Sequence, residues 1–138
     1  MSRSDMNPPA RIAYPCPKKE QPMLNWKDYR ARLMARIAEI GKASPDTLRG
    51  YQMLSGAGDK TGHLDPRTRE LIALAVAVTT RCDGCIAVHA AAAVKAGATR
   101  DQITEALGVA VSLNAGAALV YSARVMDAVD GELAEGAA

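Results

Sequence analysis

The chain of 138 residues is long enough for one folded domain. Seventeen Lys and Arg residues against fifteen Asp and Glu residues leave a net charge of +2. No basic run is interleaved with aromatic residues, which argues against a nucleic-acid partner. Phe is absent, so a core has to form from Leu, Ile, Val, Met and Ala. These side chains bury little area each, which favours burial of further surface between subunits.

Residues 1–24 are predicted to form a disordered or extended arm, because five of the seven prolines lie within residues 1–22. The folded domain is expected over residues 25–130, followed by a frayed tail over 131–138. The first residues show no signal-peptide pattern, and Gly or Asn interrupts the apolar runs before they reach the length of a membrane span. We therefore expect a cytoplasmic protein with no membrane partner.

The first part of the domain carries helix signals. Asn25 is suited to cap a helix that runs through Ile40 and ends at Gly41. The motif Ser44-Pro45-Asp46 combines a cap residue, a proline at the first helical position and an acid that suits the helix dipole. It predicts a short helix to about Leu54. The Gly-rich residues 55–62 predict a loop.

The second part contains three more predicted helices. Asp65-Pro66 is a further cap and proline, and predicts a helix to about Thr80. Residues 71–78 are apolar without interruption and would also suit a buried strand, but the start signal and the alanines favour helix. A second helix is expected from the C-x-x-C motif to Gly97.

The last helix is predicted to open with a capping box at Thr99-Arg100-Asp101-Gln102. It should be long, with a break or kink near Asn114. No hairpin turn, alternating strand or βαβ pattern occurs in the sequence. The predicted fold is therefore all-α, which argues against the thioredoxin fold that a C-x-x-C motif first suggests.

Four residues form the candidate catalytic site. Cys82 and Cys85 make the C-x-x-C motif, His89 follows four residues after Cys85, and Glu70 lies twelve residues before Cys82. An imidazole one helical turn from a thiol favours its thiolate, and the start of a helix does so to a lesser extent. Asp83 opposes this effect. If the two helices run antiparallel, Glu70 can orient His89 in a nucleophile–base–acid arrangement.

Other interpretations of these residues remain open. Cys82, Cys85 and His89 could be zinc ligands, with His63 as the fourth, although His63 lies in a predicted loop. Glu70 could be a helix-end acid that serves only the dipole. Cys16 lies outside the motif, and we interpret it as an exposed thiol without a role.

Three segments resemble the alkylhydroperoxidase D-like branch of the carboxymuconolactone decarboxylase superfamily. They are residues 64–76, the Cys82-x-x-Cys85-x3-His89 motif, and residues 95–99. The resemblance extends over about residues 26–129 and implies an all-α domain of about five to six helices that forms a homo-trimer or homo-hexamer. It implies that Cys85 reacts with peroxide, that Cys82 closes the disulfide, and that His89 and Glu70 relay the proton. The best-known peroxidase members carry a histidine at the position of Gly84.

The sequence therefore predicts a thiol peroxidase or disulfide reductase that acts on alkyl hydroperoxides, with a thiol or dithiol reductant and with no cofactor or metal. Two alternatives stay open. A lactone decarboxylase of the same fold would need a polar pocket for a dicarboxylate and would not need the cysteine pair. A redox-sensing or scaffold oligomer would use the disulfide only for structure. In many C-x-x-C enzymes the first cysteine attacks, so the roles of Cys82 and Cys85 could be reversed.

Overall fold

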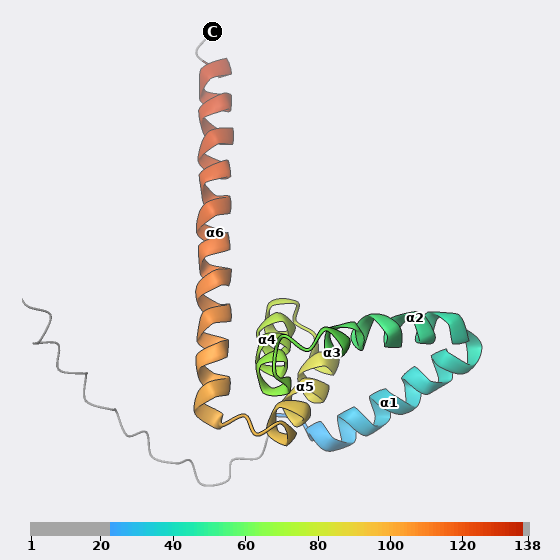
Figure 1. Cartoon of the computed structure of the whole chain (residues 1–138). Coiled ribbons are helices and arrows are strands. Elements are labelled where there is room, and N and C mark those ends of the chain that lie inside the picture. The colour runs from blue at the N-terminus through green and yellow to red at the C-terminus, as the bar shows by residue number, and fades with distance from the viewer. Residues whose placement is uncertain (1–22, 137–138) are drawn as a thin grey trace, which may run out of the picture.

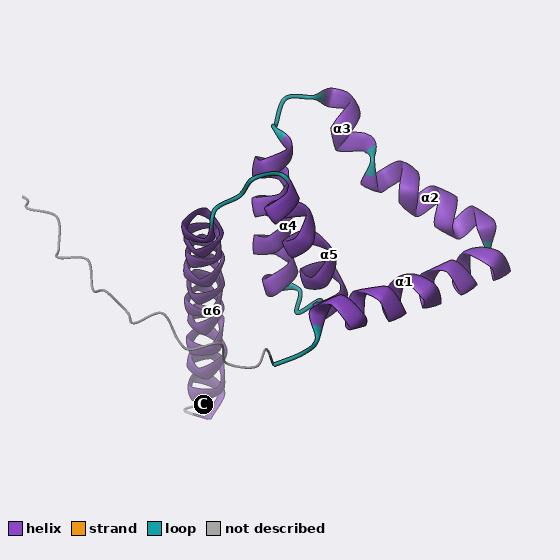
Figure 2. Cartoon of the chain, turned by 90° about the horizontal axis from the view of Figure 1, so that it is seen from below, coloured by secondary structure: helices purple, strands orange, loops and turns teal. Residues whose placement is uncertain are grey.

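The computed structural model describes residues 23–136, and every regular element in this range is a helix (Figure 2). The predicted arm over residues 1–24 lies almost entirely outside the described residues. The all-α prediction is confirmed. The six helices are α1 (Trp26–Ala43), α2 (Pro45–Ser55), α3 (Ala57–Thr61), α4 (Pro66–Thr79), α5 (Asp83–Lys95) and α6 (Arg100–Gly136).

The helices α4 and α5 form a hairpin at the centre of the molecule (Figure 1). The first part of α6 packs against α4, and α1 packs against α5. After the turn at Ser44 the chain reverses, and α2 diverges from α1 (Figure 2). Within the described residues, the buried apolar side chains all belong to α4, α5 and the first part of α6; they are Leu74, Ala77, Ala87, Ala93 and Ala110. Four of these five are alanines, which let neighbouring helix backbones approach closely but bury little area.

The predicted helix starts of α4 and α6 are present. Asp65 caps α4 by accepting the backbone N–H of Thr68 at 3.1 Å and its hydroxyl at 2.6 Å. These hydrogen bonds, the one from the hydroxyl first, hold the pKa of Asp65 below its ordinary value. At α6, the Gln102 N–H reaches Thr99 Oγ1 at 3.2 Å and the Thr99 N–H reaches Gln102 Oε1 at 3.0 Å. Both caps rest on local contacts, which is why the sequence predicts them.

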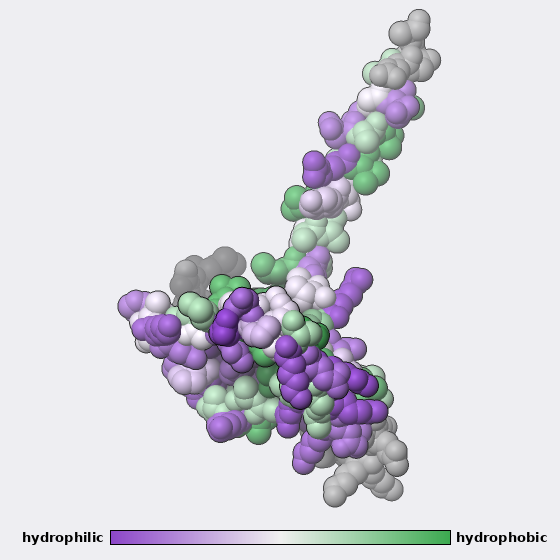
Figure 3. Space-filling model, turned by 90° about the vertical axis from the view of Figure 1, so that its right-hand side faces the viewer, coloured by the Kyte–Doolittle hydropathy of each residue, from purple (hydrophilic) through white to green (hydrophobic). Residues whose placement is uncertain are grey.

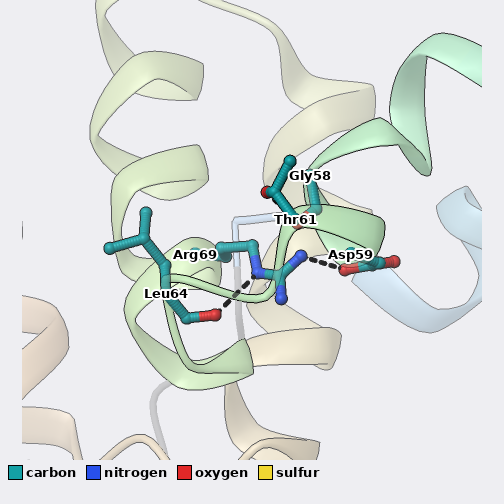
Figure 4. A network of polar contacts seen from close by, with 5 residues as sticks. All are labelled: Gly58, Asp59, Thr61, Leu64 and Arg69. Atoms are coloured by element: carbon teal, nitrogen blue, oxygen red, sulfur yellow. Dashed lines mark hydrogen bonds and ion pairs between the residues drawn. The ribbon is translucent and has the colours of Figure 1, made fainter.

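The predicted loop over residues 55–62 contains the short helix α3, so the prediction was wrong there. Thr61 Oγ1 donates to the carbonyl of Gly58 at 2.9 Å, and α3 ends at the left-handed Gly62. Arg69 on α4 donates to the Asp59 carboxylate and, through Nε, to the Leu64 carbonyl at 3.2 Å (Figure 4). A contact from another helix thus holds this one turn in place, and local sequence signals do not report such a contact.

The helix α1 does not end at Gly41 as predicted. It continues to Ala43, and the N–H of Ser44 closes it on the carbonyl of Ile40 at 2.8 Å. A Cβ atom at position 41 would collide with the side chain of Leu48 on α2. Gly41 therefore allows α1 and α2 to approach closely and does not act as a cap.

The predicted break near Asn114 is also absent, because α6 is one continuous helix. The Asn114 amide donates to the carbonyl of Ala110 at 2.7 Å and to Thr79 Oγ1 at 2.9 Å. These partners satisfy the amide without opening the helix. The helix also runs on through residues 131–136, which the sequence analysis placed in a tail.

Beyond Ala110, every α6 side chain that the structure describes is exposed (residues 111–134). This part of α6 projects from the body of the molecule and carries apolar side chains along it (Figure 3). By length and composition alone, Arg100–Ala134 could cross a membrane. Exposed apolar side chains in this number mark a surface that other protein chains or lipid cover.

Candidate active site

The link between α4 and α5 consists of Thr80, Arg81 and Cys82. Cys82 takes part both in the end of α4 and in the start of α5. The N–H of Cys82 donates to the carbonyl of Ala77 at 3.0 Å, which closes α4. The side chain of Cys82 is the N-cap of α5, and its sulfur accepts the N–H of Cys85 at 3.1 Å. A thiolate at this position would gain from the same hydrogen bond and from the positive end of the α5 dipole.

Cys82 and Cys85 are joined by a disulfide, with their Cα atoms 5.2 Å apart. Both residues are half-buried. Gly84, between them, lies under Leu33 of α1, and a Cβ atom there would come within 2.9 Å of Leu33 Cδ2. Any side chain at position 84 would therefore have to displace Leu33.

His89 and Glu70 meet across the helix hairpin. His89 Nδ1 lies 2.8 Å from Glu70 Oε2, and the two side chains are 33% and 24% exposed. Because α4 and α5 run antiparallel, residues 19 positions apart in the sequence face each other here. The contact between these two residues is the one that the sequence predicted. With Nδ1 engaged, Nε2 is the ring nitrogen left to exchange a proton with a thiol.

The two cysteines and His89 share one cavity of about 450 Å³. Its other walls come mostly from apolar side chains of α1 and α2. The lining residues are Leu33, Met34, Ile37, Leu48, Tyr51, Gln52, Ser55, Cys82, Gly84, Cys85, Val88 and His89. A cavity of this size accommodates an organic molecule of moderate size.

Sequence reasoning did not identify the walls that α1 and α2 contribute. Leu33 and Ile37 lie one helical turn apart on an apolar face of α1, but this spacing does not indicate which helix the face meets. In the structure the face closes the space beside α5. Arg30 Nη1 fixes the same contact by donating to the carbonyl of Ala87 at 3.3 Å.

The zinc interpretation finds no support in the geometry of the described chain. Within residues 23–136, no three His, Cys, Asp or Glu side chains gather in a group that could hold a metal ion. His63 is exposed in the segment between α3 and α4 and is absent from the cavity lining. Asp83 is exposed as well and is absent from the cavity lining.

The sequence model of the Carboxymuconolactone decarboxylase family matches residues 45–128, which include all four predicted site residues. The chain belongs to this family. The crystal structure of apo-lpg0406, a carboxymuconolactone decarboxylase family protein from Legionella pneumophila, is similar with a TM-score of 0.62 and 38% identity. The similarity covers 71% of this chain and 88% of that one.

Two curated relatives are similar over most of their length. An uncharacterized protein of Haemophilus influenzae is 49% identical over 104 residues, which is 75% of this chain and 92% of the relative. Uncharacterized protein 4 in the cox locus of Paracoccus denitrificans is 39% identical over 100 residues, or 70% and 90%. The family match begins at α2, so α1, with its three cavity residues, precedes the matched region.

Proposed function

We propose that this family member is a thiol peroxidase or disulfide reductase of the alkylhydroperoxidase D-like branch. The observation that carries the proposal is the common cavity, in which the Cys82–Cys85 pair lies beside an imidazole that Glu70 holds at 2.8 Å. This arrangement supplies a nucleophile, a second thiol, a base and an orienting acid, which are the groups that peroxide reduction by a dithiol needs.

In the reduced protein, Cys85 lies one helical turn before His89 and loses its proton to the imidazole. The thiolate attacks the terminal oxygen of the hydroperoxide and the O–O bond breaks. The alkoxide takes a proton from the imidazolium and leaves as the alcohol, while Cys85 becomes a sulfenic acid. Glu70 stabilises the imidazolium between these two transfers.

Cys82 completes the cycle. Its thiolate attacks the sulfenic sulfur, the S–O bond breaks, and the departing hydroxide takes up the proton that the Cys82 thiol had released, so that a disulfide and water are formed. An external dithiol then reduces this disulfide by two exchange steps and is itself oxidised. The net reaction converts one hydroperoxide and one dithiol into an alcohol, water and an oxidised dithiol.

The cavity supports this chemistry over that of a lactone decarboxylase. Among the described residues that line it, none carries a fixed positive charge, and most are apolar. A dicarboxylate substrate would lose its hydration there without gaining an ion pair. An organic hydroperoxide with an apolar body carries no charge, so it loses less hydration free energy on entering the cavity.

Because position 84 is a glycine, the proposed proton relay consists of Glu70 and His89 alone. Since Leu33 lies 2.9 Å from where a Cβ atom would be, the histidine that other members carry at this position could fit only if Leu33 moved. In this chain no second imidazole beside Cys85 can share the proton transfer.

The proposal is tested by following consumption of cumene hydroperoxide in the presence of a dithiol reductant. The wild-type chain should turn over many equivalents, and Cys85→Ser should turn over none above the rate of the reductant alone. Cys16→Ser is the control, because it removes the one cysteine outside the C-x-x-C motif. Equal rates with and without Cys85 would reject the proposal.

A further inference from the structure

Arg81 has a backbone conformation that side chains rarely adopt. Its φ is 54°, and within residues 23–136 it is the only non-glycine residue with positive φ. The other two positions with positive φ are Gly62, at 68°, and Gly97, at 81°. A side chain in this region is strained because its Cβ atom crowds the backbone, so glycine is the favoured residue.

The ends of α4 and α5 provide a direct comparison, because the same pair of backbone hydrogen bonds closes each helix. At the end of α4, the N–H of Arg81 donates to the carbonyl of Val78 (3.3 Å) and the N–H of Cys82 donates to the carbonyl of Ala77 (3.0 Å). At the end of α5, the N–H of Gly97 donates to the carbonyl of Val94 (3.1 Å) and the N–H of Ala98 donates to the carbonyl of Ala93 (2.9 Å). Arg81 thus occupies the position that Gly97 occupies one helix later. The chain uses glycine at this motif where no thiol follows and arginine where Cys82 follows.

The contacts of the Arg81 side chain do not explain why arginine stands at a position that favours glycine. The residue is exposed, and within residues 23–136 its guanidinium makes no hydrogen bond or ion pair. The two backbone hydrogen bonds hold Arg81 in its left-handed conformation, and residues held in such conformations are concentrated at functional sites. Its neighbour in the chain is the cysteine whose sulfur caps α5.

We propose that Arg81 is a positioning residue of the redox pair, whose positive charge stabilises the thiolate of Cys82. The inference rests on the proposed function, in which Cys82 must be a thiolate to attack the sulfenic acid and leaves as a thiolate when the reductant attacks Cys85. In both steps the electron pair resides on the Cys82 sulfur, and a cation beside it favours that state.

The other charged and titratable groups around the thiols do not supply this charge. They are Asp83 and His89 on α5, Glu70 on α4, Tyr51 on α2 and Arg30 on α1. Asp83 opposes a thiolate, His89 is paired with Glu70, and Arg30 donates to the carbonyl of Ala87. Arg81 therefore offsets Asp83, its counterpart on the other side of Cys82 in the sequence.

The test measures the alkylation rate of Cys82 by iodoacetamide against pH in a Cys16→Ser, Cys85→Ser background, where it is the only thiol. Arg81→Gln and Arg81→Lys keep the same backbone strain and differ in charge. A unit charge about 6 Å away in water shifts such a midpoint by about half a pH unit. We expect Arg81→Gln to raise the midpoint by that amount and Arg81→Lys to leave it unchanged.

Two further measurements separate charge from structure. The shift in Arg81→Gln should largely disappear in 1 M salt, where screening acts within about 3 Å. Arg67→Gln removes an exposed charge from the other end of α4, about 20 Å away along the helix, and should leave the midpoint unchanged. Arg81→Gly should raise the melting temperature, since it relieves the left-handed strain.

In the chain with both cysteines, at a pH above the alkylation midpoint of the variant, Arg81→Gln should increase the ratio of disulfide to dithiol about threefold at a fixed glutathione redox ratio, which corresponds to about 14 mV. Identical alkylation midpoints for wild type, Arg81→Gln and Arg81→Lys would overturn the proposal, and so would equal shifts in both variants. These readouts need no peroxide turnover. A protein without peroxidase activity but with the predicted shifts would therefore contradict the proposed function and leave the role of Arg81 intact.

Discussion

The carboxylate of Glu70 on α4 lies 2.8 Å from Nδ1 of His89 on α5, across a helix hairpin whose link carries Cys82. The hairpin thus brings together the acid, the base and both thiols within 20 residues of sequence. Its short link leaves little freedom in how the two helices align. The geometry of the site therefore depends on the packing of α4 against α5.

Glu70→Gln should reduce peroxide turnover by roughly 10²–10⁴-fold, the usual contribution of an assisted proton transfer. The amide keeps the shape and one hydrogen bond but removes the charge that stabilises the imidazolium. Stability should fall by no more than about 1 kcal/mol, the contribution of an acid near a helix start. The measurements are steady-state kinetics and thermal unfolding.

Glu70→Gln should also move the pH midpoint of Cys85 alkylation upward, whereas Asp83→Asn should move this midpoint downward. Both changes remove one carboxylate near the thiols, but only Glu70 acts through the imidazole. An unchanged alkylation profile in Glu70→Gln, together with a lower melting temperature, would show that Glu70 serves only the helix.

The two cysteines should differ in their single-mutant behaviour. Cys85→Ser should abolish peroxide turnover, because the thiol one turn from His89 is lost. Cys82→Ser should reduce one equivalent of peroxide per chain and then stop at the sulfenic acid, because no resolving thiol is present. Trapping of the sulfenic acid with dimedone and mass spectrometry distinguishes the variants. A sulfenic acid in Cys85→Ser and none in Cys82→Ser would mean that the roles are reversed.

The sequence predicted those parts of the fold and site that depend on nearby residues. Asp65 and Thr99 cap helices through residues three positions away, and Cys85 and His89 share a helix face through their spacing. The contact between Glu70 and His89 was predictable because two adjacent helices with a short link pack antiparallel. In each case the partner lies on the same helix or on the next one.

The features that the sequence missed depend on side-chain contacts between helices for which no local motif indicates the partner. The helix α3 is held by Arg69, Gly41 makes room for Leu48, and Asn114 is satisfied by Thr79 on another helix. The cavity walls from α1 and α2 also depend on where α1 docks. A pattern along one segment shows which face is apolar but does not show which partner that face meets.

The protein should form a homo-trimer or homo-hexamer through α6. Many large apolar side chains of α6 are exposed in the single chain, among them Leu119 at 75% and Val120 at 67%. A soluble single chain rarely leaves such a surface open. Light scattering at micromolar concentration should give the mass of three or six chains.

Leu119→Glu should lower that mass, and Arg32→Glu, on the exposed side of α1, should not. Because Leu119 has no cover in the single chain, its substitution affects mass only if α6 lies in an interface. A monomer, or a protein that is recovered only with membranes and requires detergent, would contradict this prediction.

Asp65 should make the stability of α4 depend on acid pH. Its pKa is lowered in the folded state by the hydrogen bonds from Thr68. The unfolded chain therefore binds a proton first as the pH falls, so this stabilisation is complete above the ordinary pKa of 3.8 and is lost below it. Asp65→Asn keeps a capping oxygen without the charge, and its melting temperature should fall less than that of wild type between pH 5 and pH 3. Parallel curves would show that Asp65 does not contribute to the acid sensitivity.

The central claim is that oxidation of the Cys82–Cys85 pair is coupled to reduction of a peroxide. The most direct measurement mixes fully reduced protein with one equivalent of cumene hydroperoxide, without reductant, and determines the alcohol and the protein mass in the same sample. We expect one alcohol per chain and a loss of two mass units, located by digestion to the peptide that contains Cys82 and Cys85. Disulfide formation without a matching amount of alcohol, or alcohol formation with both thiols still free, would contradict it.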